Sequence, residues 1–568
     1  MLNSINIAIL GNSTTDYLET ALIKECKKHE IAASIYNAPY NQYAQEILNN
    51  SSGYYSSKPD LTIIMLEGKE LFPEWYSFAT LQESNEHKVK LVEETYNSLA
   101  SLLEIIHTNC NTKIIISNFK IPYYSPLGIL DTKSKIGLKR MISTLNLKLE
   151  EFSAARDYVY IFDYTGLSSQ YGYNNSEDAK MYYIAKNTVS FSFINQMAKE
   201  YMRYILPLES KNKKCLVLDL DNTLWGGVAG EDGINGVRLD SNGAARSFYD
   251  FQLEILSLYY KGVVLAVNSK NNYEDAMEII EKHPHMLLRK KYFSVLKINW
   301  QDKAANMKEI AGELNLGIDS LVFFDDNPVE RDYVKSMLPE VKAVDVPEDV
   351  SKYSRALQEL VEFEQISITS EDIKRNEMYE ANQKRQEAQA QYDSLEDYLA
   401  GLGSVISLEN ASEFTIPRIT QLSQKTNQFN MTTVRYQTDD IAAMLETNKY
   451  LVLSCSAKDK FGDNGIVGVC IVKLDNIDAY IDTFLLSCRV LGRNIEYAFI
   501  SSVADILRGR GIQNISAKYI KTGKNVHNKD FYLNAGFSKL SETEAESNFM
   551  LGIKDKLKEF KYIDIISI

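Results

Sequence analysis

Short apolar runs alternate with amphipathic stretches along the first 208 residues, and this alternation predicts strands separated by helices. The expected strands are 5–10, 61–65, 113–117 and 159–163, and the main expected helices are 17–28 and 190–204. Strands that alternate with helices are typical of a parallel sheet covered on both faces. We therefore predict a doubly wound α/β domain over residues 1–208.

The most informative stretch, residues 215–233, reads C-L-V-L-D-L-D-N-T-L-W-G-G-V-A-G-E-D-G. Its four leading apolar residues predict a buried central strand, and Asp219 and Asp221 follow at the carboxyl end, where such sheets place their ligands. Two carboxylates one residue apart repel each other unless a cation lies between them, and Mg²⁺ is the simplest hard cation for oxygen ligands. The alternative is an acidic strand end without chemistry, because Asn222 and Thr223 favour a turn.

Two later apolar runs and one helix start favour a phosphate site over that alternative. The second run ends in Ser269, whose hydroxyl can hold a phosphoryl oxygen, and the third ends in Asp325 and Asp326. Lys303 begins an amphipathic helix between them, where its ammonium can balance the charge of nucleophile and phosphate. A single such lysine is most often a solvated helix residue, but the order Asp, Ser, Lys, Asp-Asp indicates one site.

These four motifs resemble those of the haloacid dehalogenase (HAD) superfamily of aspartyl-phosphate phosphotransferases. The resemblance implies that Asp219 is the nucleophile and Asp221 the general acid/base, with an acyl-phosphate intermediate that water hydrolyses. It also implies a phosphate held by Ser269, Lys303, Asn222 and Thr223. The implied ligands of Mg²⁺ are Asp219, the carbonyl of Asp221 and an acid of the fourth motif, Asp326 in preference to Asp325.

Composition sets broad bounds on the chain. At 568 residues it is too long for one hydrophobic core, and about two to four domains are expected. With 45% hydrophobic and 24% charged residues it reads as an ordinary soluble globular protein. The formal net charge of −14 argues against a nucleic-acid-binding protein, so an acidic partner would need a local basic patch. Richness in Lys, Asn, Ile and Tyr indicates an AT-rich bacterial genome.

The cysteines and the amino terminus indicate a cytoplasmic protein without a membrane partner. The six cysteines lack C-x-x-C spacing, which predicts neither a zinc site nor a disulfide framework; they are Cys26, Cys110, Cys215, Cys455, Cys470 and Cys488. The amino terminus has no basic segment followed by a long apolar run, and no apolar stretch reaches about 18 residues.

The first expected strand runs into G-N-S-T-T-D, which resembles the first sequence block of SGNH hydrolases. In that interpretation Ser13 is a nucleophile. The chain shows no G-x-N block, and no D-x-x-H pair after Asp163 that would supply a base. The favoured alternative is that Ser13 caps the following helix. We therefore expect this region to be a scaffold or recognition domain.

The HAD-like domain is expected over residues 211–350, followed by a helical connector over 351–402 and a third domain over 403–568. Between its first two motifs the segment 226–262 is short and leaves no room for a large lid domain. The phosphate site should therefore be open to macromolecular substrates or be covered by a neighbouring domain.

The third domain combines strands with one prominent helix. Strands are expected over 465–472 and 479–487, a helix over 495–508, and F-Y-x-x-x-G-F follows near the end. The loop S-C-R-V-L-G-R-N joins strand to helix, and the whole pattern resembles the GNAT acyltransferase fold, in which that loop cradles a pyrophosphate or pantetheine on backbone N–H groups. The resemblance assigns Arg489 and Arg493 to substrate binding.

Cys488 stands at the expected strand end just before that loop. The start of the helix, Arg489 and Arg493 would lower the pKa of its thiol and favour a nucleophilic thiolate. The alternative is a buried strand cysteine, which is the commoner fate of a cysteine in such a run. A polar stretch earlier in the domain, Q-K-T-N-Q-F-N, contributes Asn427 as a candidate for lining a substrate pocket.

Three stretches together resemble the FkbH-like family, a HAD subclass: D-L-D-N-T-L-W-G-G-V-A-G-E-D-G, Q-K-T-N-Q-F-N and S-C-R-V-L-G-R. The resemblance implies loading of a glyceryl unit from 1,3-bisphosphoglycerate onto a phosphopantetheinylated acyl carrier protein, in polyketide or related secondary-metabolite biosynthesis. In this hypothesis a cysteine thiolate attacks the acyl phosphate, Asp219 removes the 3-phosphate, and the glyceryl group passes to the carrier. Cys488 is the candidate thiolate, with Cys215 as the alternative, and His527 is a candidate base unless it is structural.

Two functions from other classes stay open. The first is a plain phosphatase on a phosphorylated metabolite or glycan precursor, in which the third domain only recognises the substrate. The second is a non-catalytic module that presents a carrier protein to other enzymes. The intact set of phosphate and metal residues argues against the second, because a binding module has no need of it.

Overall fold

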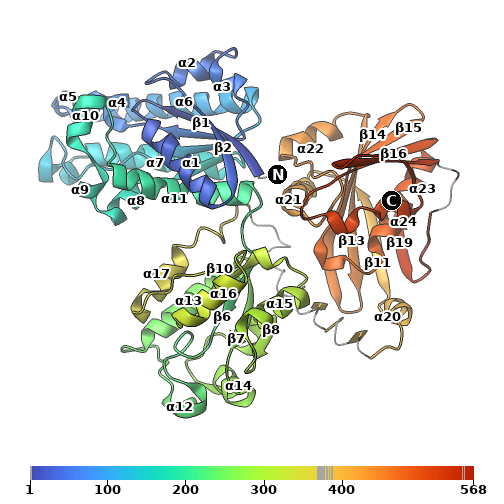
Figure 1. Cartoon of the computed structure of the whole chain (residues 1–568). Helices are drawn as coiled ribbons and strands as arrows, with labels where there is room; N and C mark the ends of the chain where they lie inside the picture. Colours follow the sequence, from blue (N-terminus) through green and yellow to red (C-terminus); the bar gives the residue numbers. More distant parts are fainter. Residues whose placement is uncertain are drawn as a thin grey trace. The chain divides into compact units, whose positions relative to one another are not determined.

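The computed structural model describes residues 3–367, 378, 381–382, 384–385, 388–389, 391–552, 554 and 557–567. The chain forms two compact units, Met1–Ile205 and Leu206–Ile568, which are coloured in sequence order in Figure 1. Among the described residues, no helix combines the length and the apolar character needed to cross a bilayer.

The first unit is built on a parallel sheet with the strand order β2-β1-β3-β4-β5. The strands are β1 (Asn3–Gly11), β2 (Ile31–Asn37), β3 (Leu61–Met65), β4 (Lys113–Ser117) and β5 (Val159–Phe162). Four of these strands were predicted, and β3 and β4 have the predicted bounds. The strand that sequence reasoning missed, β2, lies at the sheet edge and is mostly half-exposed, so it carries no continuous apolar run.

Helices pack against this sheet and carry most of the remaining residues. They are α1 (Asp16–Lys28), α2 (Tyr43–Leu48), α3 (Gly53–Ser56), α4 (Gly68–Leu71), α5 (Ala79–Gln82), α6 (Asn85–Asn109), α7 (Leu138–Ala154), α8 (Tyr164–Tyr171), α9 (Tyr173–Ser176), α10 (Ala179–Ala185) and α11 (Phe191–Leu208), with 3₁₀ turns η1 (Pro73–Tyr76) and η2 (Gly128–Lys133). Leu103 of α6 and Leu145 of α7 share one buried core with Ile114 of β4. The fold is the predicted doubly wound α/β arrangement.

The second unit begins with another parallel sheet, ordered β10-β9-β6-β7-β8. Its strands are β6 (Cys215–Leu218), β7 (Val264–Ser269), β8 (Val295–Ile298), β9 (Leu321–Phe324) and β10 (Lys342–Ala343). The helices are α12 (Ala229–Gly236), α13 (Arg246–Tyr260), α14 (Tyr273–Lys282), α15 (Lys303–Glu313), α16 (Pro328–Met337) and α17 (Tyr353–Gln358), with 3₁₀ turns η3 (Lys290–Tyr292), η4 (Ile318–Ser320) and η5 (Val350–Lys352). All four residues of β6 are buried at the sheet centre, as the apolar run predicted.

This domain extends past the expected boundary at residue 350. Tyr353, Leu357 and Phe363 are buried in the same core as Phe251 of α13. Because these apolar side chains complete that core, the predicted start of the connector at residue 351 is too early. The predicted connector over 351–402 otherwise falls partly outside the described residues, and α20 (Leu395–Gly401) is its last described helix.

A larger mixed sheet forms the rest of the second unit, in the order β17-β18-β16-β15-β14-β13-β11-β19, with β12 paired to β15. The strands are β11 (Ser404–Asn410), β12 (Phe429–Asn430), β13 (Tyr450–Asp459), β14 (Gly462–Asp475), β15 (Asp478–Leu486), β16 (Asn514–Ile520), β17 (Ser538–Glu542), β18 (Glu546–Gly552) and β19 (Ile563–Ser567). The helices are α21 (Ile416–Lys425), α22 (Thr438–Leu445), α23 (Ile495–Gly509) and α24 (Phe531–Ala535), with η6 (Cys488–Val490) and η7 (Val526–Asn528).

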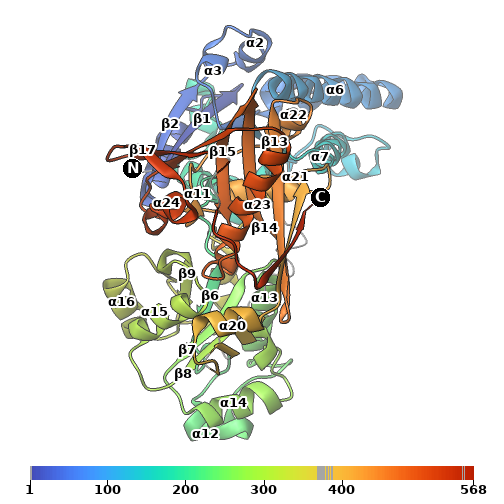
Figure 2. The ribbon, with the colours of Figure 1, turned by 90° about the vertical axis from the view of Figure 1, so that its right-hand side faces the viewer.

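Alternating side chains of this sheet supply two cores. Leu453 of β13 faces the core that contains Phe499 of α23, whereas the adjacent Val452 faces the core that contains Ile419 of α21. Figures 1 and 2 show α23 and α21 lying against β13–β15 from opposite faces. The period-two pattern of this sheet is that of strands buried on both sides.

We expect Phe251→Ala to destabilise the HAD-like domain by about 3–5 kcal/mol, because a fully buried ring that contacts Phe324 and Tyr353 would leave a cavity. Urea titration with hydrogen exchange of peptides from this domain measures the change. The matched control is Phe414→Ala, since Phe414 is 95% exposed. If the free energy of unfolding of this domain is the same in the Phe251 variant and in the control, the assigned core is contradicted.

Candidate active site

The carboxyl ends of β6, β7 and β9 bring the predicted phosphate residues to one edge of the sheet. Asp219 follows β6, Ser269 ends β7 and Asp325 follows β9. The amide of Asp219 donates to the Phe324 carbonyl at 3.0 Å, so the β6–β9 ladder continues to the first carboxylate. Because the strands are parallel, their side chains converge at this edge.

Lys303 links two of these carboxylates. Its Nζ lies 3.0 Å from Asp219 Oδ1 and 2.5 Å from Asp325 Oδ2, and the side chains of all three residues are buried. Burial alone lowers the pKa of Lys303, but the charges of Asp219 and Asp325 outweigh burial and raise it above the ordinary value. The ammonium is therefore held charged between Asp219 and Asp325.

The paired acids of the fourth motif differ in their surroundings. Asp325 uses both carboxylate oxygens internally, since Oδ2 meets Lys303 and Oδ1 accepts from the Asn327 amide at 2.9 Å. Asp326 is half-buried, and its Oδ1 accepts from the Thr223 hydroxyl at 3.4 Å. Thr223 is fully buried and also accepts from the Asp326 amide at 3.2 Å, so it fixes the position of this second acid.

Three acids at this edge fit a divalent cation. Asp219, Asp325 and Asp326 each offer a carboxylate oxygen, and these oxygens lie within 4.8 Å of one another. Asp219 Oδ1 is sealed from solvent and accepts no well-aligned hydrogen bond, although the Lys303 ammonium is near. Burial, and after it the charge of Asp219, raises the pKa of Asp325 to about 7, and a cation such as Mg²⁺ would offset the negative charges gathered here.

Asp221 is held in a separate set of hydrogen bonds beside the cluster. Its Oδ1 accepts from Trp225 Nε1 at 2.9 Å and from the Ala229 amide at 3.0 Å, and its Oδ2 accepts from Asn271 Nδ2 at 2.8 Å. Burial raises its pKa, against the effect of these donors, and the charge of Asp219 adds to the rise. A fixed carboxyl with a raised pKa suits a group that gives and takes a proton.

The turn after the first motif requires a residue with unusual backbone freedom. Asn222 has φ of 53°, a left-handed conformation that asparagine tolerates. Its Oδ1 accepts from the Gly227 amide at 2.9 Å, so the side chain stabilises the turn. Asn222 thus has an internal role beside the predicted phosphate contact. Ser269 is buried, and none of the described residues offers its hydroxyl a hydrogen bond, which leaves it available to a phosphate.

Sequence reasoning missed three asparagines that position the site. Asn271 follows the second motif and orients Asp221. Asn268 donates to the Lys303 carbonyl at 2.9 Å and accepts from Asn306 at 3.1 Å, which fastens the start of α15 to β7. The N-S-K-N run over residues 268–271, at the end of β7, was the only signal for Asn268 and Asn271, because no periodicity marks such contacts.

In the large mixed sheet, Cys488 begins η6 and is half-buried. Arg489 donates to the Ser487 hydroxyl at 3.1 Å and to Met378 Sδ. Arg493 is buried, donates to Asp459 Oδ2 at 2.9 Å, and shares that carboxylate with Arg385. A phosphate would have to compete with Asp459 for Arg493, which does not favour the predicted role of this arginine.

The remaining candidates have the following environments. Asn427 is half-buried, and its side-chain oxygen accepts from Arg435 at 2.8 Å. His527 is exposed in η7. Cys215 is fully buried at the amino end of β6, and burial raises the pKa of its thiol, so it does not suit the role of nucleophile.

Ser13 does not cap α1, so the favoured alternative for this residue was wrong. The residue at the N-cap is Thr15, and its hydroxyl donates to Asn37 at 2.6 Å. Ser13 is 3% exposed and lies two residues earlier, beyond the reach of a cap. The hydrolase-like interpretation gains nothing from this, because no D-x-x-H pair follows Asp163 in the sequence.

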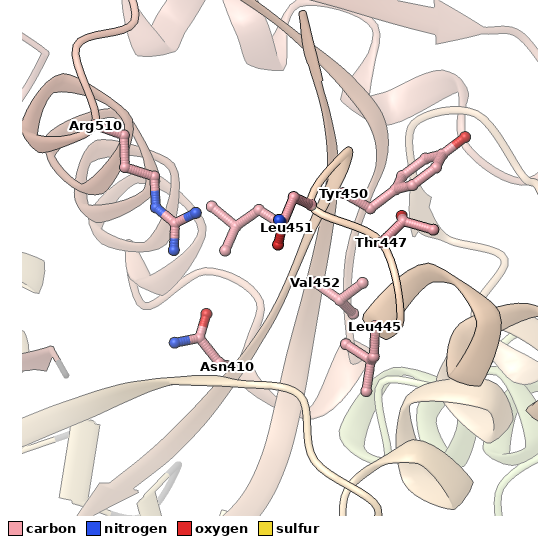
Figure 3. Close-up of a pocket in the computed structure, with 8 residues that line it drawn as sticks. Asn410, Leu445, Thr447, Tyr450, Leu451, Val452 and Arg510 are labelled. Atoms are coloured by element: carbon pink, nitrogen blue, oxygen red, sulfur yellow. The ribbon is translucent and has the colours of Figure 1, made fainter.

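A cavity of about 350 Å³ opens in the large mixed sheet, away from every predicted site residue (Figure 3). Its lining comprises Asn410, Leu445, Thr447, Asn448, Tyr450, Leu451, Val452 and Arg510. Figure 3 shows Arg510 and Asn410 on the left, the Leu451 side chain directed toward Arg510, and Thr447, Tyr450, Val452 and Leu445 on the right. The lining holds no nucleophile beside a base, so the carboxylate cluster remains the candidate active site.

Two family models match separate parts of the chain. Residues 6–206 match the model of the FkbH N-terminal domain, and residues 214–374 match the model of NLI interacting factor-like phosphatases. The two matches follow the first unit and the HAD-like domain. No curated protein matches the chain.

Solved structures extend this comparison. The chain is similar to the N-terminal part of the protein BF1531 from Bacteroides fragilis, which contains a phosphatase domain complexed with Mg, at 31% identity and a TM-score of 0.60. That similarity covers 65% of this chain and 96% of the solved one. The ribosomal-protein-S18-alanine N-acetyltransferase from Escherichia coli matches at 12% identity and a TM-score of 0.22, covering 28% of this chain and 97% of the enzyme.

We expect Asp326→Asn to lower the affinity for Mg²⁺ at least about tenfold, because Asp326 has the carboxylate least engaged by protein groups. Calorimetric titration of the purified chain with MgCl₂ measures it. Asp332→Asn is the control, since Asp332 is exposed on the adjacent α16. Unchanged affinity in the Asp326 variant would exclude this residue as a ligand.

We expect Asn271→Ala to reduce kcat about 10- to 100-fold while the Mg²⁺ affinity stays within error, because Asn271 orients Asp221 and contacts none of the acids of the metal cluster. Turnover of p-nitrophenyl phosphate and MgCl₂ titration give the two values. Asn272→Ala, the exposed neighbour, should retain full turnover. An equal loss of kcat in both variants would show that turnover depends on the loop as a whole and not on the contact between Asn271 and Asp221.

Proposed function

We propose that this chain, which belongs to the FkbH-like family and carries a Mg²⁺-dependent phosphatase domain of the HAD type, dephosphorylates a three-carbon acyl group and loads it as glyceryl onto an acyl carrier protein. The observation that supports it most is the buried arrangement of Asp219 and Lys303 beside a hydrogen-bonded Asp221. An attacking carboxylate, a fixed ammonium and a protonated acid are the groups that phosphate removal needs.

In the first half of phosphate removal, an Asp219 oxygen attacks phosphorus in line with the leaving oxygen. The new bond joins Asp219 to phosphorus, the bond to the substrate oxygen breaks, and Asp221 gives its proton to that oxygen. Lys303 and the Ser269 hydroxyl hold the phosphoryl oxygens. A bound Mg²⁺ supplies charge neutralisation between the acids and the phosphate.

In the second half, water replaces the enzyme at phosphorus. Asp221, now a carboxylate, takes a proton from the water as it attacks, and the bond between Asp219 and phosphorus breaks. Phosphate leaves and both acids return to their starting states. The hydrogen bonds from Trp225 and Asn271 keep Asp221 in place through both proton transfers.

The acyl transfer requires a thiol outside this cluster. In the proposal the Cys488 thiolate attacks the carbonyl carbon of 1,3-bisphosphoglycerate, a thioester forms, and the 1-phosphate leaves with the electron pair of the broken bond. The carrier's phosphopantetheine thiolate then attacks the thioester carbonyl, the bond to the Cys488 sulfur breaks, and Cys488 leaves as the thiolate. Only Cys110 and Cys488 are not buried among the six cysteines, and burial raises the pKa of the Cys110 thiol.

A plain phosphatase on a phosphorylated metabolite is the second candidate. The observation in its favour is that Arg489 and Arg493 both serve internal contacts, so neither guanidinium is free to activate Cys488. A non-catalytic carrier module has no such support, because it leaves the buried charge cluster without a purpose.

We expect a glyceryl adduct on a phosphopantetheinylated carrier protein after incubation with Mg²⁺ and 1,3-bisphosphoglycerate, measured as intact mass. Asp219→Asn should accumulate phosphoglyceryl-enzyme, because the thioester forms but its phosphate stays. Cys488→Ala should give no adduct on either protein.

Cys110→Ala is the matched control, since Cys110 is the other cysteine that is not buried, and it should load the carrier normally. Phosphate release by the wild type without an adduct on either protein would refute the transfer and leave the plain phosphatase.

A further inference from the structure

Acyl carrier proteins are acidic helical domains, so the proposed partner needs a basic surface on a chain of net charge −14. The predicted place near Arg489 and Arg493 does not offer one, because Arg493 is buried against Asp459. A lysine-rich stretch after β16 is also neutralised, since Lys524 pairs with Asp319 and Lys529 with Glu542, each at 2.7 Å.

Residues 120–140 of the first unit provide such a surface. This segment, the basic loop, joins β4 to the start of α7 and holds five basic residues, Lys120, Lys133, Lys135, Lys139 and Arg140, against one acid, Asp131. Asp131 is 4% exposed, and its carboxylate accepts from the amides of Leu138 and Lys139 at 2.9 and 3.2 Å. The one negative charge is therefore hidden at a helix start.

Three of the five cations in the basic loop have no carboxylate partner. Lys120 pairs with Glu177 at 2.9 Å and the charge of Lys135 acts on Glu86, whereas no carboxylate among the described residues pairs with Lys133, Lys139 or Arg140. Lys133, Lys135 and Arg140 are exposed. Unpaired cations on an acidic chain form a local attractive field for an acidic partner.

The same loop exposes large apolar side chains. Tyr123 is 71% exposed, Tyr124 85%, Ile129 90% and Leu130 59%. The rings of Tyr123 and Tyr124 meet edge to face at 5.0 Å, and Lys139 Nζ lies 5.6 Å from the Tyr123 ring centre. Apolar residues exposed together and rimmed by cations are typical of an interface.

Internal hydrogen bonds hold the loop in this form. The Ser134 amide donates to the Leu130 carbonyl at 3.0 Å, Arg140 donates to the Lys135 carbonyl at 2.8 Å, and Asp131 fastens η2 to α7. A pre-ordered surface binds without the entropic cost of ordering a loop.

We propose that the basic loop is the docking surface for the acyl carrier protein, with the exposed tyrosines and Ile129 receiving apolar side chains of the carrier and the lysines pairing with its acids. This inference rests on the proposed function for the identity of the partner. It gives the first unit a role in recognition, where sequence reasoning left the choice between a scaffold and a recognition domain open.

The test measures the Kd of the full chain for a phosphopantetheinylated carrier protein by biolayer interferometry. Lys133→Glu combined with Lys135→Glu, and Tyr124→Ser combined with Ile129→Ser, should each weaken binding at least about tenfold. Wild-type binding should also weaken between about 50 and 300 mM NaCl, because the attraction is between exposed charges.

The controls alter the same residue types on α1 and α2 of the same unit. Lys24→Glu combined with Lys27→Glu, and Ile23→Ser combined with Leu48→Ser, change exposed residues and should bind like the wild type. Turnover of p-nitrophenyl phosphate should be unchanged in all variants, and hydrogen exchange of peptides from the first unit should match the wild type, which shows that the altered unit is folded.

Wild-type Kd values in the loop variants overturn the docking surface, as does a wild type that binds no carrier. The proposal is also overturned if the loop variants weaken binding to phosphatidylserine vesicles, or weaken self-association in sedimentation, but bind the carrier protein as the wild type does. Failure of the proposed function is separate: carrier that binds through the loop but never gains an adduct refutes glyceryl loading and leaves the docking surface standing.

Discussion

The active-site edge depends on one ammonium placed among acids. Lys303 meets Asp219 and Asp325 in a region closed to solvent, where unpaired charge is costly. The strand order places β6 between β9 and β7, which brings the strand ends that carry Asp219, Ser269 and Asp325 together. The lysine contact explains why Asp325 and Asp326 divide their work, one holding the lysine and the other left for a cation. Removing the lysine would leave several carboxylates in mutual repulsion.

Much of this site could be predicted from the sequence, because short apolar strands end in reactive side chains. The runs before Asp219, Ser269 and Asp325 predicted strands, and parallel strands place their carboxyl ends together. The contacts of Asn268 and Asn271 could not be predicted, since they depend on side-chain geometry across loops and follow no period. The edge strand β2 was missed for a related reason: half-exposed strands have a mixed sequence.

Ion pairs between residues far apart in the sequence also limited what could be predicted about the large mixed sheet. Arg493 reads as a cation beside a glycine loop, but Asp459, which lies in a different strand, turns it inward. The domain boundary was predicted too early for a similar reason. Tyr353 and Phe363 stand among polar residues in the sequence, but they complete the core around Phe251. The local sequence shows which residues are present. Only the fold shows which of them already contact another part of the protein.

The burial of the cysteines determines which parts of the protein are sensitive to oxidants. Four thiols are buried, and Cys488 stands half-buried at the start of η6. Oxidation to a sulfenic acid begins at an accessible thiolate, whereas a carboxylate such as that of Asp219 has no comparable reaction. If the proposed transfer depends on Cys488, mild oxidation of the cell silences it and leaves phosphate removal running. In that proposal, acyl loading stops under oxidative stress before any folded protein is lost.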